Sequence, residues 1–116
     1  MNGMTGELRD QLKALRAQYR GSLLQKTDAI AQLLSQVQRE APRVEILREA
    51  HLRAHSLHGT AGSYELHAVG EAAGRLEEAL FTLLQNVQDA QDAWTRVDAA
   101  GAELIAEAQL ATAQAE

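Results

Sequence analysis

Apolar residues recur along the chain at the three- and four-residue spacings that are typical of amphipathic helices. The N-terminal third carries two such groups: Leu8, Leu12, Leu15 and Tyr19, then Leu23, Ile30, Leu34 and Val37. Gly21 and Ser22 weaken the pattern between the groups, so they predict either two helices, with Ser22 capping the second, or one long helix with a kink. Pro42 then predicts a break, because proline suits the first turn of a following helix.

Three further apolar stripes follow. Their members are Leu47, Ala50, Ala54, Leu57, Ala61 and Tyr64; Val69, Ala73, Leu76, Leu80, Leu83 and Val87; and Trp94, Val97, Gly101, Leu104, Ala108 and Ala111. The pattern slips around residues 64–67, which predicts a turn, and Asp89 or Asp92 could cap the last helix. The tail from Ala106 to Glu116 is expected to fray. Short connections between such helices predict an all-α fold, an up-down four-helix bundle with an additional N-terminal helix.

Composition supports the helical prediction and narrows the function classes. Of the 116 residues, 46% are hydrophobic but only 3% aromatic, and a single proline is present, which favours one helix-rich domain over residues 1–116. The absence of cysteine excludes disulfides and cysteine metal sites. A net charge of −5 offers no general attraction to nucleic acid or acidic membranes. No apolar run approaches the length of a membrane span and no signal core is evident, so we expect a cytoplasmic protein.

A stripe of histidines lies one residue over from the apolar stripe of residues 47–64. It comprises Arg48, His51, His55, His58 and Gly62. Successive helical residues are about 100° apart, so the apolar stripe should face inward and the histidine stripe should lie beside it, largely open to solvent.

Two glycines, Gly59 and Gly62, follow His55 within this predicted helix. A helical glycine costs about 1 kcal/mol relative to alanine, which suggests that missing side chains are useful here. Helical side chains lean toward the N-terminus, so a side chain at Gly59 would lean over His55. The pattern therefore predicts a helix-borne histidine that stays accessible to another protein.

A neutral imidazole is a good nucleophile near pH 7, because its ordinary pKa is about 6.5. Attack on an acyl phosphate also needs an in-line approach and nearby cations, which Arg48, Arg53, His51 and His58 could supply. The chain offers no phosphate-binding glycine loop, ATP site or dedicated metal cage. A phosphoryl donor would therefore bring both the phosphoryl group and its metal.

The run from Ala54 to Tyr64, AHSLHGTAGSY, followed by Leu76 and Glu77, resembles the signature of histidine-containing phosphotransfer (HPt) domains. Those domains are helical bundles that shuttle phosphoryl groups between aspartates on response-regulator receiver domains. The matching positions are the active histidine at His55, the leucine at Leu57, the glycine at Gly59 and the later alanine at Ala61. The resemblance covers about residues 5–113, which we take as the core of the domain.

The resemblance implies that His55 is the phosphoacceptor. The residues expected to support it are His51, His58, Gly59, Gly62 and Glu77. Two positions depart from the family pattern: His58 stands at the usual lysine, which removes a fixed positive charge, and Glu65 stands where a glycine commonly ends the helix.

The same resemblance implies a place in a multistep two-component phosphorelay. The chain would act as a phosphoryl-transfer intermediate without a kinase catalytic site, binding response-regulator receivers and also a hybrid histidine kinase. It would need no intrinsic cofactor or metal, since the receiver supplies Mg²⁺. We expect a monomer that binds neither nucleic acid nor membrane.

Alternatives remain open from the residues themselves. His51, His55 and His58 are spaced so that their imidazoles could grip Zn²⁺ or Ni²⁺ on one helix face. The chain could also be an adaptor that docks a receiver without transferring phosphate. Glu77 could hydrogen-bond a ring nitrogen of His55 or simply face solvent, and His67 is interpreted as plain surface.

Overall fold

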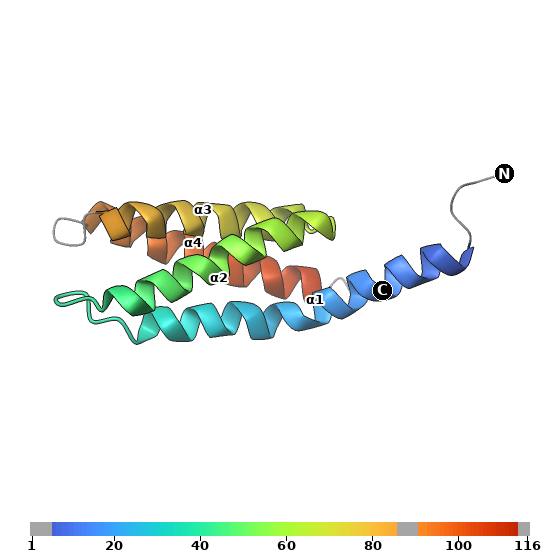
Figure 1. Cartoon of the computed structure of the whole chain (residues 1–116), viewed down its shortest axis with the longest axis horizontal. Helices are drawn as coiled ribbons and strands as arrows, with labels where there is room; N and C mark the ends of the chain where they lie inside the picture. Colours follow the sequence, from blue (N-terminus) through green and yellow to red (C-terminus); the bar gives the residue numbers. More distant parts are fainter. Residues whose placement is uncertain (1–5, 86–90, 114–116) are drawn as a thin grey trace.

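Four α-helices form the protein in the computed structural model, which describes residues 6–85 and 91–113. They are α1 (Gly6–Ser35), α2 (Val44–Ser63), α3 (His67–Gln85) and α4 (Gln91–Ala113). Each helix contacts the next one in the sequence and α4 also contacts α1, so the four helices close a ring around one core. Consecutive helices run in alternating directions along the long axis (Figure 1). The all-α prediction is confirmed.

The additional N-terminal helix is absent from the described residues, because residues 6–35 form one continuous helix. Gly21 has open space around it, so nothing forces a break there. The Ser22 hydroxyl donates to the Tyr19 carbonyl at 2.7 Å inside the helix rather than capping a new one. The long-helix alternative is therefore the one observed, and the first turns of α1 extend beyond the other three helices (Figure 1).

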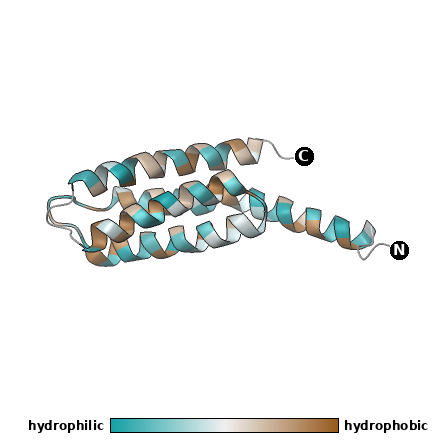
Figure 2. Cartoon of the chain, turned by 90° about the horizontal axis from the view of Figure 1, so that it is seen from above, coloured by the Kyte–Doolittle hydropathy of each residue, from teal (hydrophilic) through white to brown (hydrophobic). Residues whose placement is uncertain are grey.

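The core is built from the predicted apolar stripes that follow Tyr19. The residues of the first predicted group before Tyr19 do not join it, since Leu8 and Leu15 are 41% and 47% exposed. Figure 2 shows hydrophobic and hydrophilic residues alternating along each helix, as amphipathic packing requires. The largest fully buried side chains are Leu23, Leu47, Leu76, Leu80, Leu83, Leu104, Val69 and Val97. On α2 the buried stripe is rich in alanine, with Ala50, Ala54 and Ala61 fully buried. Small side chains allow α3 to approach α2 closely, which brings the side chains flanking the stripe within reach of α3.

The predicted helix ends differ from the structure in detail. The break at Pro42 is present, but α2 begins at Val44 with Arg43 as its N-cap, so Pro42 precedes the first turn. Asp92 lies in the first turn of α4 instead of capping it. Asp89 and Val87 lie outside the described residues. The tail expected to fray is helical as far as Ala113.

The predicted turn after α2 is a Schellman motif. The Leu66 N–H donates to the Ala61 carbonyl at 2.9 Å, and the Glu65 N–H donates to the Gly62 carbonyl at 3.1 Å. The motif requires a left-handed residue, and Glu65 supplies it with a φ of 62°. The chain thus forms the turn that glycine usually makes, and Leu66 packs against the core beyond it.

Candidate functional site

His55 lies in the middle of α2 on the solvent side of the buried stripe. Its side chain is 66% exposed, while Ala54 and Leu57, which belong to the stripe, are buried. The α2 periodicity therefore separates scaffold from site, as the sequence predicts: the apolar stripe holds the helix and the next stripe presents the histidine.

Glu77 reaches His55 from the neighbouring helix. Its Oε2 lies 2.6 Å from Nδ1 of His55, and its Oε1 lies 2.9 Å from Nδ1 of His58. One carboxylate thus joins two imidazoles of α2 from α3. An ionised carboxylate only accepts hydrogen bonds, so the Nδ1 atom of each neutral ring carries the proton. In that tautomer Nε2 of His55 keeps an unshared electron pair.

The environment of Glu77 keeps its carboxyl group ionised. The side chain is only 20% exposed, and this burial pushes the pKa upward. Hydrogen bonds from His58 and His55 together outweigh the burial, so the pKa of Glu77 lies below its ordinary value of 4.5. The group is therefore negative at neutral pH, where it can hold the Nδ1 proton of His55.

Three glycines shape the space around these side chains. A Cβ atom added at Gly59 or Gly62 would meet nothing within 4 Å, so the flank of α2 that follows His55 is open. Gly74 on α3 is different, because its Cβ would lie 3.1 Å from both Cε1 and Nε2 of His58. The His58 ring therefore rests directly over Gly74.

A hollow of about 550 Å³ surrounds the exposed histidine between α2 and α3. Its rim carries two large apolar side chains, Leu52 at 60% and Phe81 at 52% exposure. The ring centroids of His51 and Phe81 are 6.2 Å apart. The lining comprises His51, Leu52, His55, His58, Gly74, Glu77, Glu78 and Phe81.

The structure brings most of the predicted site residues together. His51, His55, His58 and Glu77 share the hollow, whereas Gly59 and Gly62 lie outside its lining. The backbone of Gly62 instead approaches α3, since a Cβ added at Gly70 would lie 3.5 Å from the Gly62 nitrogen.

Other residues named from the sequence lie apart from the hollow. Arg53 pairs with Glu49 at 2.8 Å, Arg48 does not line the hollow, and His67 begins α3 outside it.

Sequence reasoning missed Gly74, Leu52 and Phe81. Leu52 and Phe81 were detectable as apolar residues outside the buried stripes of their helices. Gly74 lies one helical turn before Glu77, but its role depends on the position of a ring on another helix.

The alternative of a histidine metal site lacks support from the geometry. Within residues 6–85 and 91–113, no group of three or more His, Cys, Asp or Glu side chains is arranged to hold a metal ion. The Nδ1 atoms of His55 and His58 are both engaged by Glu77.

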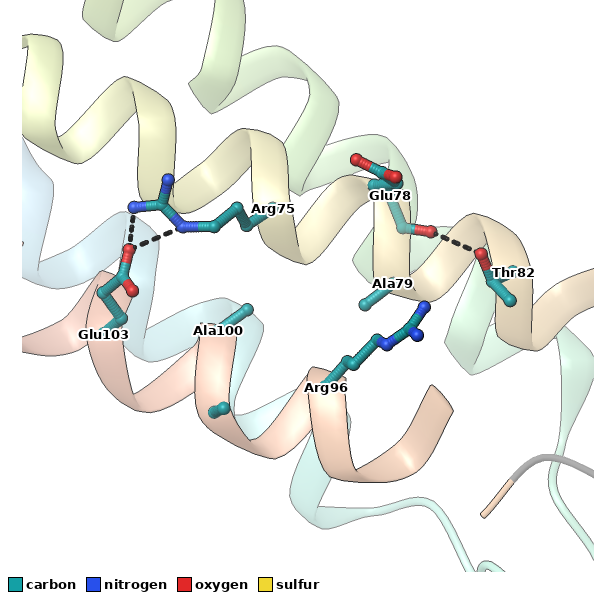
Figure 3. A pocket seen from close by; sticks show the side chains of 8 residues that line it. Arg75, Glu78, Ala79, Thr82, Arg96, Ala100 and Glu103 are labelled. Carbon is teal, nitrogen blue, oxygen red and sulfur yellow. Dashed lines mark hydrogen bonds and ion pairs between the residues drawn. The ribbon is translucent and has the colours of Figure 1, made fainter. Parts of the chain in front are cut away.

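A second groove lies on the next face of α3, against α4 (Figure 3). Arg75 donates to Glu103 there, with Nε 2.8 Å from Oε1. Arg96 lies across the groove and Glu78 at its edge, so two arginines and two glutamates balance in charge. With no net positive charge and no histidine, this groove offers little to a phosphoryl group.

The family model of the Hpt domain matches residues 4–114, nearly the whole chain. The chain therefore belongs to the Hpt domain family, whose members carry out histidine phosphotransfer in phosphorelays and work with response-regulator receivers. Comparisons with curated proteins and with solved structures gave no match. None of the four described helices combines the length and apolar character that a membrane-spanning segment needs.

Proposed function

We propose that this protein accepts a phosphoryl group on Nε2 of His55 from a receiver aspartate and passes it to a second receiver. The observation that carries the proposal is the exposed His55 ring with Nδ1 held at 2.6 Å by Glu77. This contact favours the tautomer in which Nε2 is the nucleophile, and the exposure of the ring leaves that atom accessible.

The transfer step balances without a cofactor of the chain itself. The Nε2 electron pair attacks phosphorus, an N–P bond forms, and the bond from phosphorus to the aspartate oxygen breaks. The aspartate leaves as a carboxylate with the bonding electrons. The imidazole becomes positively charged during attack, and the adjacent Glu77 carboxylate stabilises that charge while Nδ1 keeps its proton. Reversal of the same step delivers the phosphoryl group to the next receiver.

The transferring phosphoryl group also needs cations. We propose that Mg²⁺ bound in the acidic pocket of the receiver supplies this charge, so that the chain needs no metal or cofactor of its own. His58 stands at the usual lysine position, and its Nδ1 atom is hydrogen-bonded to Glu77. The receiver therefore carries the main electrostatic work on the phosphoryl oxygens.

The hollow around His55 suits a protein partner. Leu52 and Phe81 are apolar, largely exposed and adjacent to the histidine, which favours an apolar contact ringed by polar groups. The open flank at Gly59 would admit the receiver loops that approach the nucleophile. We propose that the chain docks receivers here as a cytoplasmic monomer, and that a hybrid histidine kinase is one source of the phosphoryl group.

The proposal is tested with a phosphorylated receiver and matched histidine variants. The wild type should acquire an acid-labile, base-stable phosphate, His55→Gln should acquire none, and His67→Gln should label like the wild type. His67 is a suitable control because it lies outside the hollow. Circular dichroism should show all three proteins equally helical. Receiver binding without labelling of the wild type would instead identify a non-transferring adaptor.

A further inference from the structure

We infer that His58 is a positioning residue that fixes the Glu77 carboxylate, so that its second oxygen holds His55 in the reactive tautomer. The inference rests on the proposed function, because the tautomer matters only if Nε2 of His55 is the nucleophile. It departs from the role implied by the usual lysine, which would put a positive charge at this position.

Each carboxylate oxygen of Glu77 accepts a hydrogen bond from a different histidine. Oε1 accepts from Nδ1 of His58 at 2.9 Å, and Oε2 accepts from Nδ1 of His55 at 2.6 Å. A glutamate side chain has three rotatable bonds, so one hydrogen bond to an exposed ring leaves the carboxylate free to turn. The second bond, from a residue one turn further along α2, restricts that rotation and keeps Oε2 directed at His55.

Gly74 provides the seat for the His58 ring. A Cβ atom at this position would come within 3.1 Å of Nε2 and Cε1 and within 3.3 Å of Cδ2. These separations are tighter than ordinary van der Waals contact, so the ring would have to shift by a few tenths of an ångström. The ring edge therefore lies on the α3 backbone, one turn before Glu77 on the same helix. A side chain at position 74 would push the His58 ring away from α3, and so away from the carboxylate that it reaches.

Both ring nitrogens of His58 are directed at α3. Nδ1 is bonded to Glu77, and Nε2 lies over Gly74. We therefore expect neither atom to contact a phosphoryl group on Nε2 of His55. The contacts of His58 are therefore those of a residue that acts through Glu77.

The test compares two amides at position 58. In His58→Asn the side-chain nitrogen lies near the place of Nδ1 and can still donate to Oε1, whereas in His58→Gln it lies near the place of Nε2 and cannot. The His55 tautomer is read from its ring ¹⁵N chemical shifts in the unphosphorylated protein. We expect the Nδ1–H tautomer in the wild type and in His58→Asn, and a shift toward Nε2–H in His58→Gln.

Transfer rates from a phosphorylated receiver should follow the tautomer. We expect His58→Gln to lose about tenfold in rate and His58→Asn to remain within about threefold of the wild type, because misdirected catalytic groups lose rate steeply. Circular dichroism should show both variants fully helical. An unchanged His55 tautomer in His58→Gln would overturn the inference.

A second pair of variants tests the seat. Gly74→Ala should displace His58 and shift the His55 tautomer as His58→Gln does, while Gly101→Ala should leave it unchanged. Gly101 is the matched control because an added Cβ there meets only Leu34, at 4.0 Å. If His55 keeps the wild-type tautomer in Gly74→Ala, the claim that Gly74 positions the His58 ring is contradicted. The two proposals can fail separately. If the variants shift the His55 tautomer but the wild type accepts no phosphoryl group, the proposed function is contradicted while the positioning role of His58 is supported.

Discussion

His55 on α2 and Glu77 on α3 form one unit across the interface of two helices, with Nδ1 of the ring 2.6 Å from a carboxylate oxygen. The histidine is two-thirds exposed and the glutamate four-fifths covered. A partly covered, ionised acceptor beside an accessible ring defines which ring nitrogen carries the proton. The reactivity of the exposed Nε2 atom therefore depends on the hydrogen bond between Nδ1 of the same ring and Glu77.

Glu77→Gln should slow phosphoryl transfer while preserving the helices. The amide oxygen can still accept from Nδ1, but it carries no charge to stabilise the imidazolium formed during attack. A hydrogen bond involving a charged group contributes about 1.5–3 kcal/mol, so we expect a rate loss of at least about tenfold. Rapid-quench measurement of transfer from a phosphorylated receiver gives the rate. Glu78→Gln is the control, since Glu78 lines the same hollow without bonding either histidine, and an equal loss in both variants would contradict a specific role for Glu77.

Gly59→Gln should weaken receiver docking without harming the fold. A Cβ atom here meets nothing within 4 Å, and a longer side chain is expected to lean toward His55. Replacing a helical glycine should raise helix stability by up to about 1 kcal/mol. Calorimetric titration with a receiver should therefore show weaker binding of a more stable protein. Gly21→Gln, equally open but on α1, should bind normally; wild-type affinity in Gly59→Gln would show that access along this flank is unimportant.

The apolar rim should dominate receiver affinity. Leu52→Ser and Phe81→Ser should each weaken binding by about tenfold, as expected for exposed side chains that become buried at the centre of an interface. Leu110→Ser serves as the control, because Leu110 is 53% exposed but does not line the hollow. Wild-type affinity should depend only weakly on ionic strength. A steep loss of affinity between low and moderate salt would indicate a charge-dominated interface instead.

Local periodicity accounts for the parts of this protein that the sequence predicts well. The buried stripe of α2 and the exposed position of His55 follow from the spacing of apolar residues on one helix. The prediction of a separate N-terminal helix was wrong. Gly21 lowers the helix propensity locally, but residues 6–35 continue through it as one helix. The turn after α2 was predicted, but the left-handed Glu65 follows from Schellman hydrogen bonds to preceding carbonyls.

Contacts between helices were harder to predict. The sequence placed Glu77 as a candidate partner of His55, but sharing of the carboxylate with His58 depends on the register of α2 against α3. The position of the His58 ring over Gly74 depends on the same register, and so does the presence of Leu52 and Phe81 around one hollow. Periodicity within one helix carries no information about that register.

The free energy of unfolding should depend on pH through an ion pair between Asp98 of α4 and Arg39, in the loop that precedes α2. Arg39 donates to Asp98 with Nη1 3.0 Å from Oδ2, and its guanidinium lies 4.4 Å from the Trp94 ring centroid. The hydrogen bond from Arg39 outweighs burial and lowers the pKa of Asp98 below its ordinary value of 3.8. Since the folded pKa is depressed, the pair stabilises the fold above the unfolded pKa and loses this effect as pH falls through the folded value.

Asp98→Asn should therefore lower the free energy of unfolding at neutral pH, by less than about 1 kcal/mol because the pair is half exposed. Urea titrations should show the difference shrinking below about pH 4. In an Arg39→Gln background, Asp98→Asn should have little further effect at neutral pH. A loss of the same size in both backgrounds would show that Asp98 acts independently of Arg39.

The most direct test of the account is the chemical position of the phosphate on the labelled protein. After incubation with a phosphorylated receiver, ¹H–³¹P correlation spectra of the wild type should show one phosphohistidine, with phosphorus bonded to Nε2 of His55 and Nδ1 bearing its proton beside Glu77. Phosphorus on Nδ1, or on His51 or His58 in place of His55, would contradict the claim that Glu77 selects the nucleophilic atom.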